Sequence, residues 1–139
     1  MTGEEARRRF GTQPVARLAT ADPAGRPHLV PVVFVLADPT IYTAVDAKRK
    51  RHTALRRLAN VAANPRVAVL VDHYEDDWRA LWWVRADGRA RVLDTADGEA
   101  RAALERLVDR YPQYRVQPPP GPVLAIDVDR WSGWSADGR

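Results

Sequence analysis

The sequence predicts a mainly β protein, an antiparallel sheet that closes into a small barrel with flanking helices. Six or more short strand-like runs follow one another in hairpin-like succession, and only two substantial helical patterns stand among them. Strands and helices do not alternate, which disfavours a doubly wound parallel sheet. The chain has 139 residues, the size of one domain, so we expect residues 1–139 to form a single domain.

The first half of the chain contains strand patterns separated by turn residues. A short N-terminal helix is expected to end at Gly11, and a half-buried strand follows over 15–20. The apolar run 28–37 contains Pro31, which cannot donate to a sheet ladder, so an edge position or a bulge is expected there. Another strand, over 41–45, leads into a basic segment.

The second half begins with an amphipathic helix. Thr53 is a plausible N-cap for this helix, and Asn64-Pro65 ends it before a β-branched strand over 66–74. Asp87-Gly88 stands between two strand-like runs and predicts a two-residue hairpin. The remaining segments are a second amphipathic helix over 97–111, a stiff proline-rich connector over 112–122 and a last strand over 123–131.

Composition excludes several classes of protein. Hydrophobic residues make up 45% of the chain and charged residues 29%, as in globular proteins. No apolar run reaches the length of a membrane span, and the N-terminus has no apolar segment typical of a secretory signal, so a cytoplasmic location without membrane contact is expected. The absence of cysteine excludes disulfides, zinc thiolates and cysteine nucleophiles.

Hydrolytic and metal-dependent chemistry find little support in the sequence. The only serines, Ser132 and Ser135, lie near the C-terminus outside any nucleophile-elbow pattern. The acidic run 72–77 contains one histidine, His73, and no second histidine lies at ligand spacing. We therefore interpret this run as a solvated loop and predict no metal site.

Basic residues are concentrated around the start of the first amphipathic helix. The only two lysines of the chain, Lys48 and Lys50, lie there, whereas the other twenty basic residues are arginines. Free backbone N–H groups and the helix dipole favour an anion at such a position, so the cluster is either a solvated face or an anion site. Its members are Lys48, Arg49, Lys50, Arg51, Arg56 and Arg57.

Two kinds of anion suit this cluster. Nucleic acid would require basic residues along a groove with stacking aromatics, and the usual signatures are missing, so no nucleic-acid partner is expected. A nucleotide-like cofactor requires one phosphate pocket and a flat apolar slot, which fits the chain better. Strand alternation places Trp82 and Trp83 on opposite faces, so one is expected in the core and the other could lie against a planar ligand.

Three stretches resemble the pyridoxamine 5′-phosphate oxidase-like flavin-binding split β-barrel family: "LATADPAGRPHLVPV", "NPRVAVLVD" and "WWVRADGRA". The resemblance extends over about residues 15–136, and it is strongest for the branch that uses the deazaflavin coenzyme F420. It implies an FMN-binding-like split barrel that dimerises, with a cofactor groove between the subunits. It also implies an oxidoreductase in which the cofactor performs the chemistry, so no catalytic side chain is predicted.

The resemblance further implies which residues contact the cofactor. The ring system would lie along the first strands, the phosphate would be held by the basic cluster, and Trp83, or Trp131 and Trp134, could wall the substrate side. The predicted cofactor-binding residues are Ala19, Thr20, Pro31, Val32, Lys48, Lys50, Arg51, Arg56, Arg57 and Trp83.

We therefore expect a homodimeric oxidoreductase that binds F420 and transfers a hydride to a small unsaturated or quinone-like substrate. The phosphate and several carboxylates of F420 would use six basic groups more fully than a single phosphate would. Two alternatives keep the fold: an oxidoreductase that binds FMN, and a non-catalytic flavin- or deazaflavin-binding protein.

Overall fold

A computed structural model describes the backbone of residues 1–46 and 51–138 and the side chains of residues 1–46 and 56–138. The described residues form one seven-stranded antiparallel sheet with the strand order β2-β1-β5-β6-β7-β4-β3. The strands are β1 Ala16–Ala21, β2 Pro27–Val32, β3 Val35–Ala37, β4 Thr40–Ala44, β5 Arg66–His73, β6 Trp82–Leu93 and β7 Val123–Ser135. The helices are α1 Gly3–Thr12, α2 Arg51–Ala63, the 3₁₀ turn η1 Trp78–Ala80, α3 Gly98–Arg110 and α4 Pro112–Val116.

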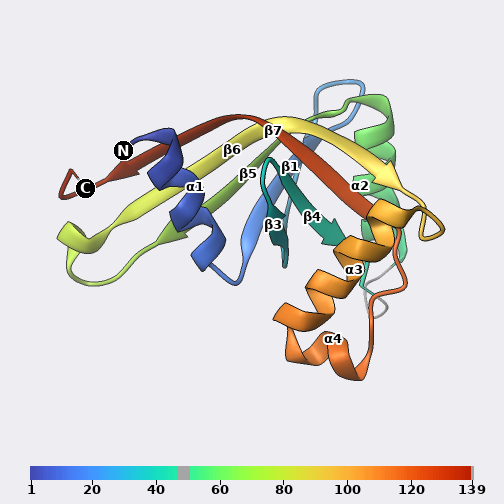
Figure 1. Ribbon diagram of the computed structural model, residues 1–139. Coiled ribbons are helices and arrows are strands. Elements are labelled where there is room, and N and C mark those ends of the chain that lie inside the picture. Colours follow the sequence, from blue (N-terminus) through green and yellow to red (C-terminus); the bar gives the residue numbers. More distant parts are fainter. Residues whose placement is uncertain (47–50, 139) are drawn as a thin grey trace.

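The sheet curls into a half-barrel, as Figure 1 shows, which confirms the predicted mainly β, split-barrel fold class. Successive side chains of each strand point to opposite faces of the curled sheet, and those on the inner face are apolar. Leu18, Val69, Val84 and Ala86 point inward and are at most 1% exposed. Helix α1 packs against β6 and β7, α2 against β1 and β6, and α3 against β3, β4 and β7. The core therefore lies between the inner face and these helices.

Helix α1 is anchored by Phe10, which is fully buried. Its ring centroid lies 4.9 Å from that of Phe34 and 5.1 Å from that of Trp131. The prediction that this helix ends at Gly11 is wrong by one residue, since it continues to Thr12. The Phe10 carbonyl accepts the Gln13 N–H at 3.3 Å, so the helix closes after the glycine rather than at it.

The predicted hairpin at Asp87-Gly88 is wrong. Strand β6 runs without a turn from Trp82 to Leu93 and pairs with β5 on one side and β7 on the other. The register with β7 shifts between Asp87 and Gly88, which marks a β-bulge. A Cβ at Gly88 would lie 2.3 Å from the Asp127 carbonyl oxygen, so the glycine permits a close approach of two strands.

Other boundaries also differ from the sequence prediction. Thr53 lies inside α2, because that helix begins at Arg51. The run 28–37 divides into β2 and β3 at Val33 and Phe34, while Pro31 lies in β2 at one edge of the described sheet, as predicted. The proline-rich connector contains helix α4, and β7 extends past residue 131 to Ser135.

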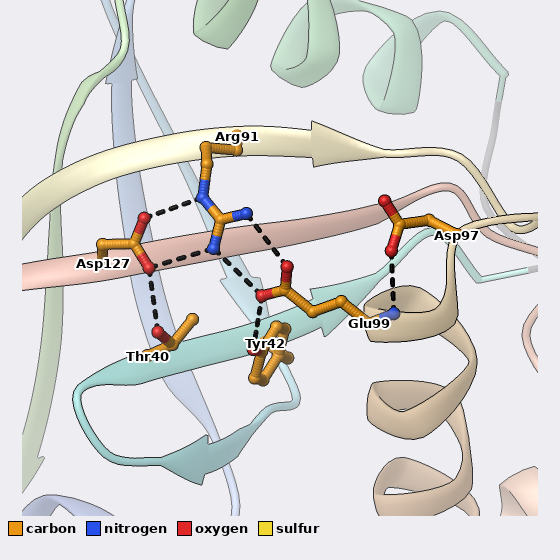
Figure 2. Close-up of polar contacts among 6 residues, drawn as sticks. All are labelled: Thr40, Tyr42, Arg91, Asp97, Glu99 and Asp127. Atoms are coloured by element: carbon orange, nitrogen blue, oxygen red, sulfur yellow. Dashed lines mark hydrogen bonds and ion pairs between the residues drawn. The ribbon is translucent and has the colours of Figure 1, made fainter.

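A polar network joins the start of α3 to β4, β6 and β7 (Figure 2). Arg91 donates from Nε to Asp127 at 2.7 Å and from Nη2 to Glu99 at 3.0 Å. Thr40 donates to Asp127 at 2.8 Å, and the Tyr42 hydroxyl donates to Glu99 at 2.6 Å. The carboxylates are therefore held by neighbours on both sides, and we interpret this network as a clamp that fixes α3 on the sheet.

Candidate functional site

The predicted site residues are distributed over the two faces of the sheet. Ala19 and Trp83 line a groove on the outer face, where Pro31 is also exposed. Thr20 and Val32 point inward and are 4% and 6% exposed, so only their backbone could contact a ligand on the outer face.

The basic cluster is described in part. Arg56 is exposed and Arg57 is buried on α2. Arg51 is described by its backbone alone, as the first residue of α2. Lys48 and Lys50 lie outside the described residues, so their predicted contact with phosphate stays a prediction.

The outer groove is apolar at its floor and has a volume of about 570 Å³. Register brings its residues together: Ala19 pairs with both Leu29 and Ala68, and Asp72 pairs with Trp83. Leu29 is 66% exposed although it lies among apolar neighbours. The ion pair between Arg17 and Asp72, at 3.4 Å, lies in the wall of the groove.

Aromatic side chains extend this face. Trp134 is directly opposite Trp83 on the neighbouring strand and is 46% exposed, so both indoles lie on the outer side of the sheet. Trp82 and Trp131 pack against the core instead. The prediction that Trp82 and Trp83 lie on opposite faces is confirmed, and Trp83 is the one available to a planar ligand.

A second, polar pocket of about 250 Å³ lies between the β1–β2 hairpin and α2. Thr20 and His28 pair across the hairpin, and the buried Asn60 of α2 donates from Nδ2 to the Thr20 hydroxyl at 3.0 Å. Arg56, one helical turn before Asn60, forms another part of the wall. Asp22 and Arg26 close the pocket at the hairpin and bind each other at 3.0 Å.

The pKa of His28 in this polar pocket responds to burial and to two arginines of α2. Partial burial, then the charges of Arg56 and Arg57, lower the pKa of the His28 imidazole below its usual value. Its Nδ1 is buried without a hydrogen-bond partner among the described residues. An oxyanion suits this donor set, because it would offset the positive charge that now disfavours the imidazolium.

His28, Asn60, Leu29 and Leu70 were missed by the sequence analysis as site residues. The signal for His28 was present, because strand alternation places it on the same side of its strand as Val30 and Val32. The proximity of Asn60 to Thr20 had no such signal, since it depends on how α2 docks onto β1. Leu29 and Leu70 become groove residues only through the register of β2, β1 and β5.

The acidic segment after β5 forms no metal cluster among the described residues. His73 and Glu75 lie 2.5 Å apart, and the His73 ring stacks on Trp82 with a centroid separation of 6.3 Å. Both partners are more than 40% exposed. Within the described part of the chain, no helix combines the length and apolar character that a bilayer span requires.

The curled sheet, the apolar outer groove and the polar pocket beneath α2 define a split β-barrel protein with features of a ligand-binding site. The model of the family described as pyridoxamine 5′-phosphate oxidase matches residues 2–135. The chain belongs to the pyridoxamine 5′-phosphate oxidase family. A search of curated protein sequences found no match.

Similar solved structures support the fold. A FAD-binding protein from Mesorhizobium loti is 24% identical, with 96% of this chain and 92% of that chain covered and a TM-score of 0.71. The heme storage protein HutZ from Vibrio cholerae is 16% identical, with 95% and 90% covered and a TM-score of 0.71. A FAD-binding protein from Mycobacterium smegmatis is 18% identical, with 96% and 94% covered and a TM-score of 0.65.

Proposed function

We propose that this protein is a homodimeric oxidoreductase that binds the deazaflavin coenzyme F420 and reduces a small unsaturated or quinone-like molecule. The observation that carries the proposal is the pair of complementary surfaces on one sheet. A positive pocket lies beneath α2, and an apolar groove with an exposed tryptophan lies on the opposite face of the same strands. A cofactor with a long anionic tail and a flat ring requires both kinds of surface.

The tail of the cofactor is assigned to the basic side of the sheet. Arg56 is exposed and no described carboxylate lies within ion-pair distance of it, so it can bind a phosphate or carboxylate without losing an existing salt bridge. Lys48, Lys50 and Arg51 come before it in sequence and would extend the positive surface. Arginine offers a bidentate contact and lysine a point charge, which together suit a phosphate followed by carboxylates.

The ring is assigned to the outer side of the first strands. Strand β2 is an edge of the described sheet, so its outer backbone groups are free of a neighbouring strand and can approach a ring. Ala19 is small and leaves room, while Trp83 and Trp134 can exclude water from one side. When bound, the reduced deazaflavin supplies a hydride to the acceptor, which also takes up a proton, and the cofactor becomes oxidised.

We propose that a second copy of the chain covers the outer groove. One subunit leaves Leu29, Tyr74 and Trp134 exposed on or beside this face, and exposed apolar side chains that gather on one face are typical of an interaction site. The walls carry both signs of charge, as in the Arg17–Asp72 pair, so the face is compatible with itself under two-fold symmetry. Pairing of two copies would enclose a ring that a single half-barrel leaves open to water.

A flavin nucleotide is the second candidate cofactor, because two of the structural neighbours are FAD-binding proteins. The test is equilibrium binding of F420, FMN and FAD to the purified protein, followed through tryptophan quenching at two salt concentrations. Tight binding of F420 over FMN and FAD supports the proposal. Selective binding of FMN or FAD favours the flavin-binding alternative over F420. Failure to bind any of the three cofactors overturns the proposal.

Turnover separates an enzyme from a cofactor-binding protein without activity. The protein with reduced F420 bound is mixed with a quinone or an activated enone, and oxidation of the cofactor is followed by absorbance.

Arg56→Ala is expected to weaken F420 binding by about 1–3 kcal/mol, the usual loss for a charged hydrogen bond. The matched control is Arg101→Ala on the exposed face of α3, which is expected to bind normally.

A further inference from the structure

The outer face of the sheet extends beyond the apolar groove that the proposed function uses. A second pocket of about 610 Å³ continues the groove at the end where β5 begins, and the two share Ala19 and Ala68. The side chains at this end are charged, since Arg66 of β5 and Arg130 of β7 line the second pocket. The outer face therefore passes from an apolar stretch to a basic end on the same strands.

Three arginines on neighbouring strands make this end basic. Arg66 lies directly opposite Arg89 in the pairing of β5 with β6, and both side chains are exposed. Like charges in directly opposite positions destabilise a sheet. Among the described residues, no carboxylate forms an ion pair with Arg66, Arg89 or the exposed Arg130. A bound anion would relieve the repulsion between the opposed guanidinium groups.

The carboxylates on the adjoining strands are engaged elsewhere. Asp87 is bound to Arg85 at 3.1 Å. Asp127 lies opposite Arg89 in the pairing of β6 with β7, but it is bound to Arg91 at 2.7 Å. Neither carboxylate could move to the basic end without losing an existing ion pair, whereas an anion from outside the chain has no such pair to lose.

One carboxylate at this end, that of Asp129, is exposed and has no ion pair among the described residues. The β-bulge places it there: Asp87 pairs with Arg130 and Gly88 pairs with Val128, so Asp129 has no partner on β6. It lines the same pocket as Arg130. Asp129 would repel an anion, so its replacement should change anion binding in the opposite direction to replacement of the arginines.

We propose that the hydride acceptor of this protein bears a carboxylate, which Arg66 and Arg130 bind while Arg89 adds a third positive charge. This inference rests on the proposed function, in which the cofactor ring lies over the apolar part of the outer face. Each guanidinium can donate two parallel hydrogen bonds to a carboxylate. Arg66 follows the Ala68 position at a spacing of about 7 Å along β5, which suits a small unsaturated or aromatic acid. The carboxylate is unchanged in the reaction and serves to hold the acceptor.

The first experiment uses the cofactor-free protein and two probes of the same shape, cinnamate and the neutral cinnamamide. Calorimetric titration measures the affinity for each. We expect cinnamate to bind about tenfold more tightly than cinnamamide, and this ratio to fall towards one in Arg66→Gln and in Arg130→Gln. Equal affinity for the two probes in the unmodified protein overturns the subsite, as does a preference for cinnamate that both variants retain.

Two further variants test whether the effect depends on position. Asp129→Asn should bind cinnamate more tightly and leave cinnamamide binding unchanged, because it removes the repelling charge. Arg101→Gln on the exposed face of α3 alters the net charge of the protein as Arg66→Gln does, and should keep the ratio of the unmodified protein. A loss of the ratio in Arg101→Gln would show that net charge alone attracts cinnamate, which contradicts a site at the basic end.

Thermal unfolding separates a binding role from a structural one. Arg89→Gln should raise the melting temperature of the free protein, because it removes the repulsion from Arg66, and should also weaken cinnamate binding. A lower melting temperature, with cinnamate binding unchanged, would assign Arg89 a structural role and remove it from the subsite.

The same arginines could instead bind a carboxylate or phosphate of the cofactor, or the acidic segment 72–77 of a second copy. F420 affinity and light scattering of Arg66→Gln distinguish these sources from an acceptor. A loss of F420 affinity as large as that in Arg56→Ala would assign the arginines to the cofactor. Dissociation of a dimer would assign them to the second copy. Either result overturns the acceptor subsite.

The two proposals can fail separately. A preference for cinnamate in a protein that binds no F420 retains the anion site and removes the proposed function. Conversely, if the protein with reduced F420 bound reduces a neutral quinone and a carboxylate-bearing quinone with the same KM, the proposed function stands and the subsite is removed.

Discussion

At the scale of single residues, Thr20 and Asn60 connect the sheet to the helix that carries the basic side chains. Thr20 is 4% exposed and Asn60 5% exposed, and their hydrogen bond is 3.0 Å long. Buried polar groups are costly to leave without a partner, so this bond fixes the position of α2 over β1. The distance between Arg56 and His28 depends on that position.

Removing either partner should destabilise the protein. Thr20→Val leaves the Asn60 amide without its acceptor, and Asn60→Ala removes the donor, so each is expected to lower the free energy of unfolding by about 1–3 kcal/mol. Urea unfolding of both single variants and the double variant measures the coupling between them. Additive losses, with no coupling, would contradict the hydrogen bond as the tie between α2 and β1.

At the scale of elements, β6 is the strand that holds the two halves of the sheet together. It pairs with β7 along its whole length and with β5 from Trp82 to Arg89, and its bulge at Asp87/Gly88 accommodates the change in register with β7. Gly88 is needed because the Asp127 backbone occupies the space of a side chain. Asp87-Gly88, whose composition is typical of a hairpin turn, therefore allows β6 and β7 to approach each other closely.

Gly88→Ala should be destabilising by about 1–3 kcal/mol, since the added methyl would force two backbones apart. Gly98→Ala is the matched control: no atom lies within 4 Å of its Cβ position, and its place in the first turn of α3 tolerates alanine. Thermal unfolding of both variants provides the comparison. Equal melting temperatures would show that β7 can shift without cost.

The clamp around Arg91 predicts a loss of stability in acid. Hydrogen bonds from Arg91 lower the pKa values of Glu99 and Asp127 below those of the unfolded chain. Their stabilising contribution is therefore complete above the unfolded pKa values and is lost as the pH falls below about 4. Arg91→Met should flatten the decline in stability between pH 6 and 3.

Denaturant unfolding at several pH values tests this expectation. Arg7→Met is the control, because it removes a 2.8 Å surface ion pair with Asp38 outside the clamp. If the two variants show the same acid dependence as the unmodified protein, the clamp does not contribute to stability in this range.

At the scale of the whole molecule, the curled sheet presents one covered face and one open face. Helices α1, α2 and α3 cover the inner face, as Figure 1 shows, whereas the outer groove between β2 and β6 remains uncovered by the described chain. A homodimer through this face would explain why Leu29 is exposed among apolar neighbours.

Light scattering at micromolar concentration should report a dimer. Leu29→Glu is expected to shift the protein to monomer, because two carboxylates would be buried at the two-fold interface without partners. Val116→Glu, which makes the same change at a side chain that is 88% exposed on α4, should leave the dimer intact. A monomer in the unmodified protein would remove the shared-groove model.

Much of this architecture could be predicted from local patterns. Alternation identified the strands and placed Trp82 and Trp83 on opposite faces, and Pro31 correctly indicated an edge. The family motifs predicted a split barrel, and the family match over residues 2–135 supports that prediction. The errors occurred where local signals competed with distant partners: Asp87-Gly88 has the composition of a turn, but β5 and β7 impose an extended conformation.

The sequence by itself determined the three longest helices, most of the strands and the concentration of positive charge around the start of α2, because these depend on neighbours within a few residues. Only the tertiary structure decided which side chains meet. His28 and Asn60 are 32 positions apart, and they share a pocket because β2 pairs with β1 while α2 docks onto the same strand. Pairing and docking are set by the total burial and hydrogen bonding of the whole sheet, which no short stretch of sequence contains.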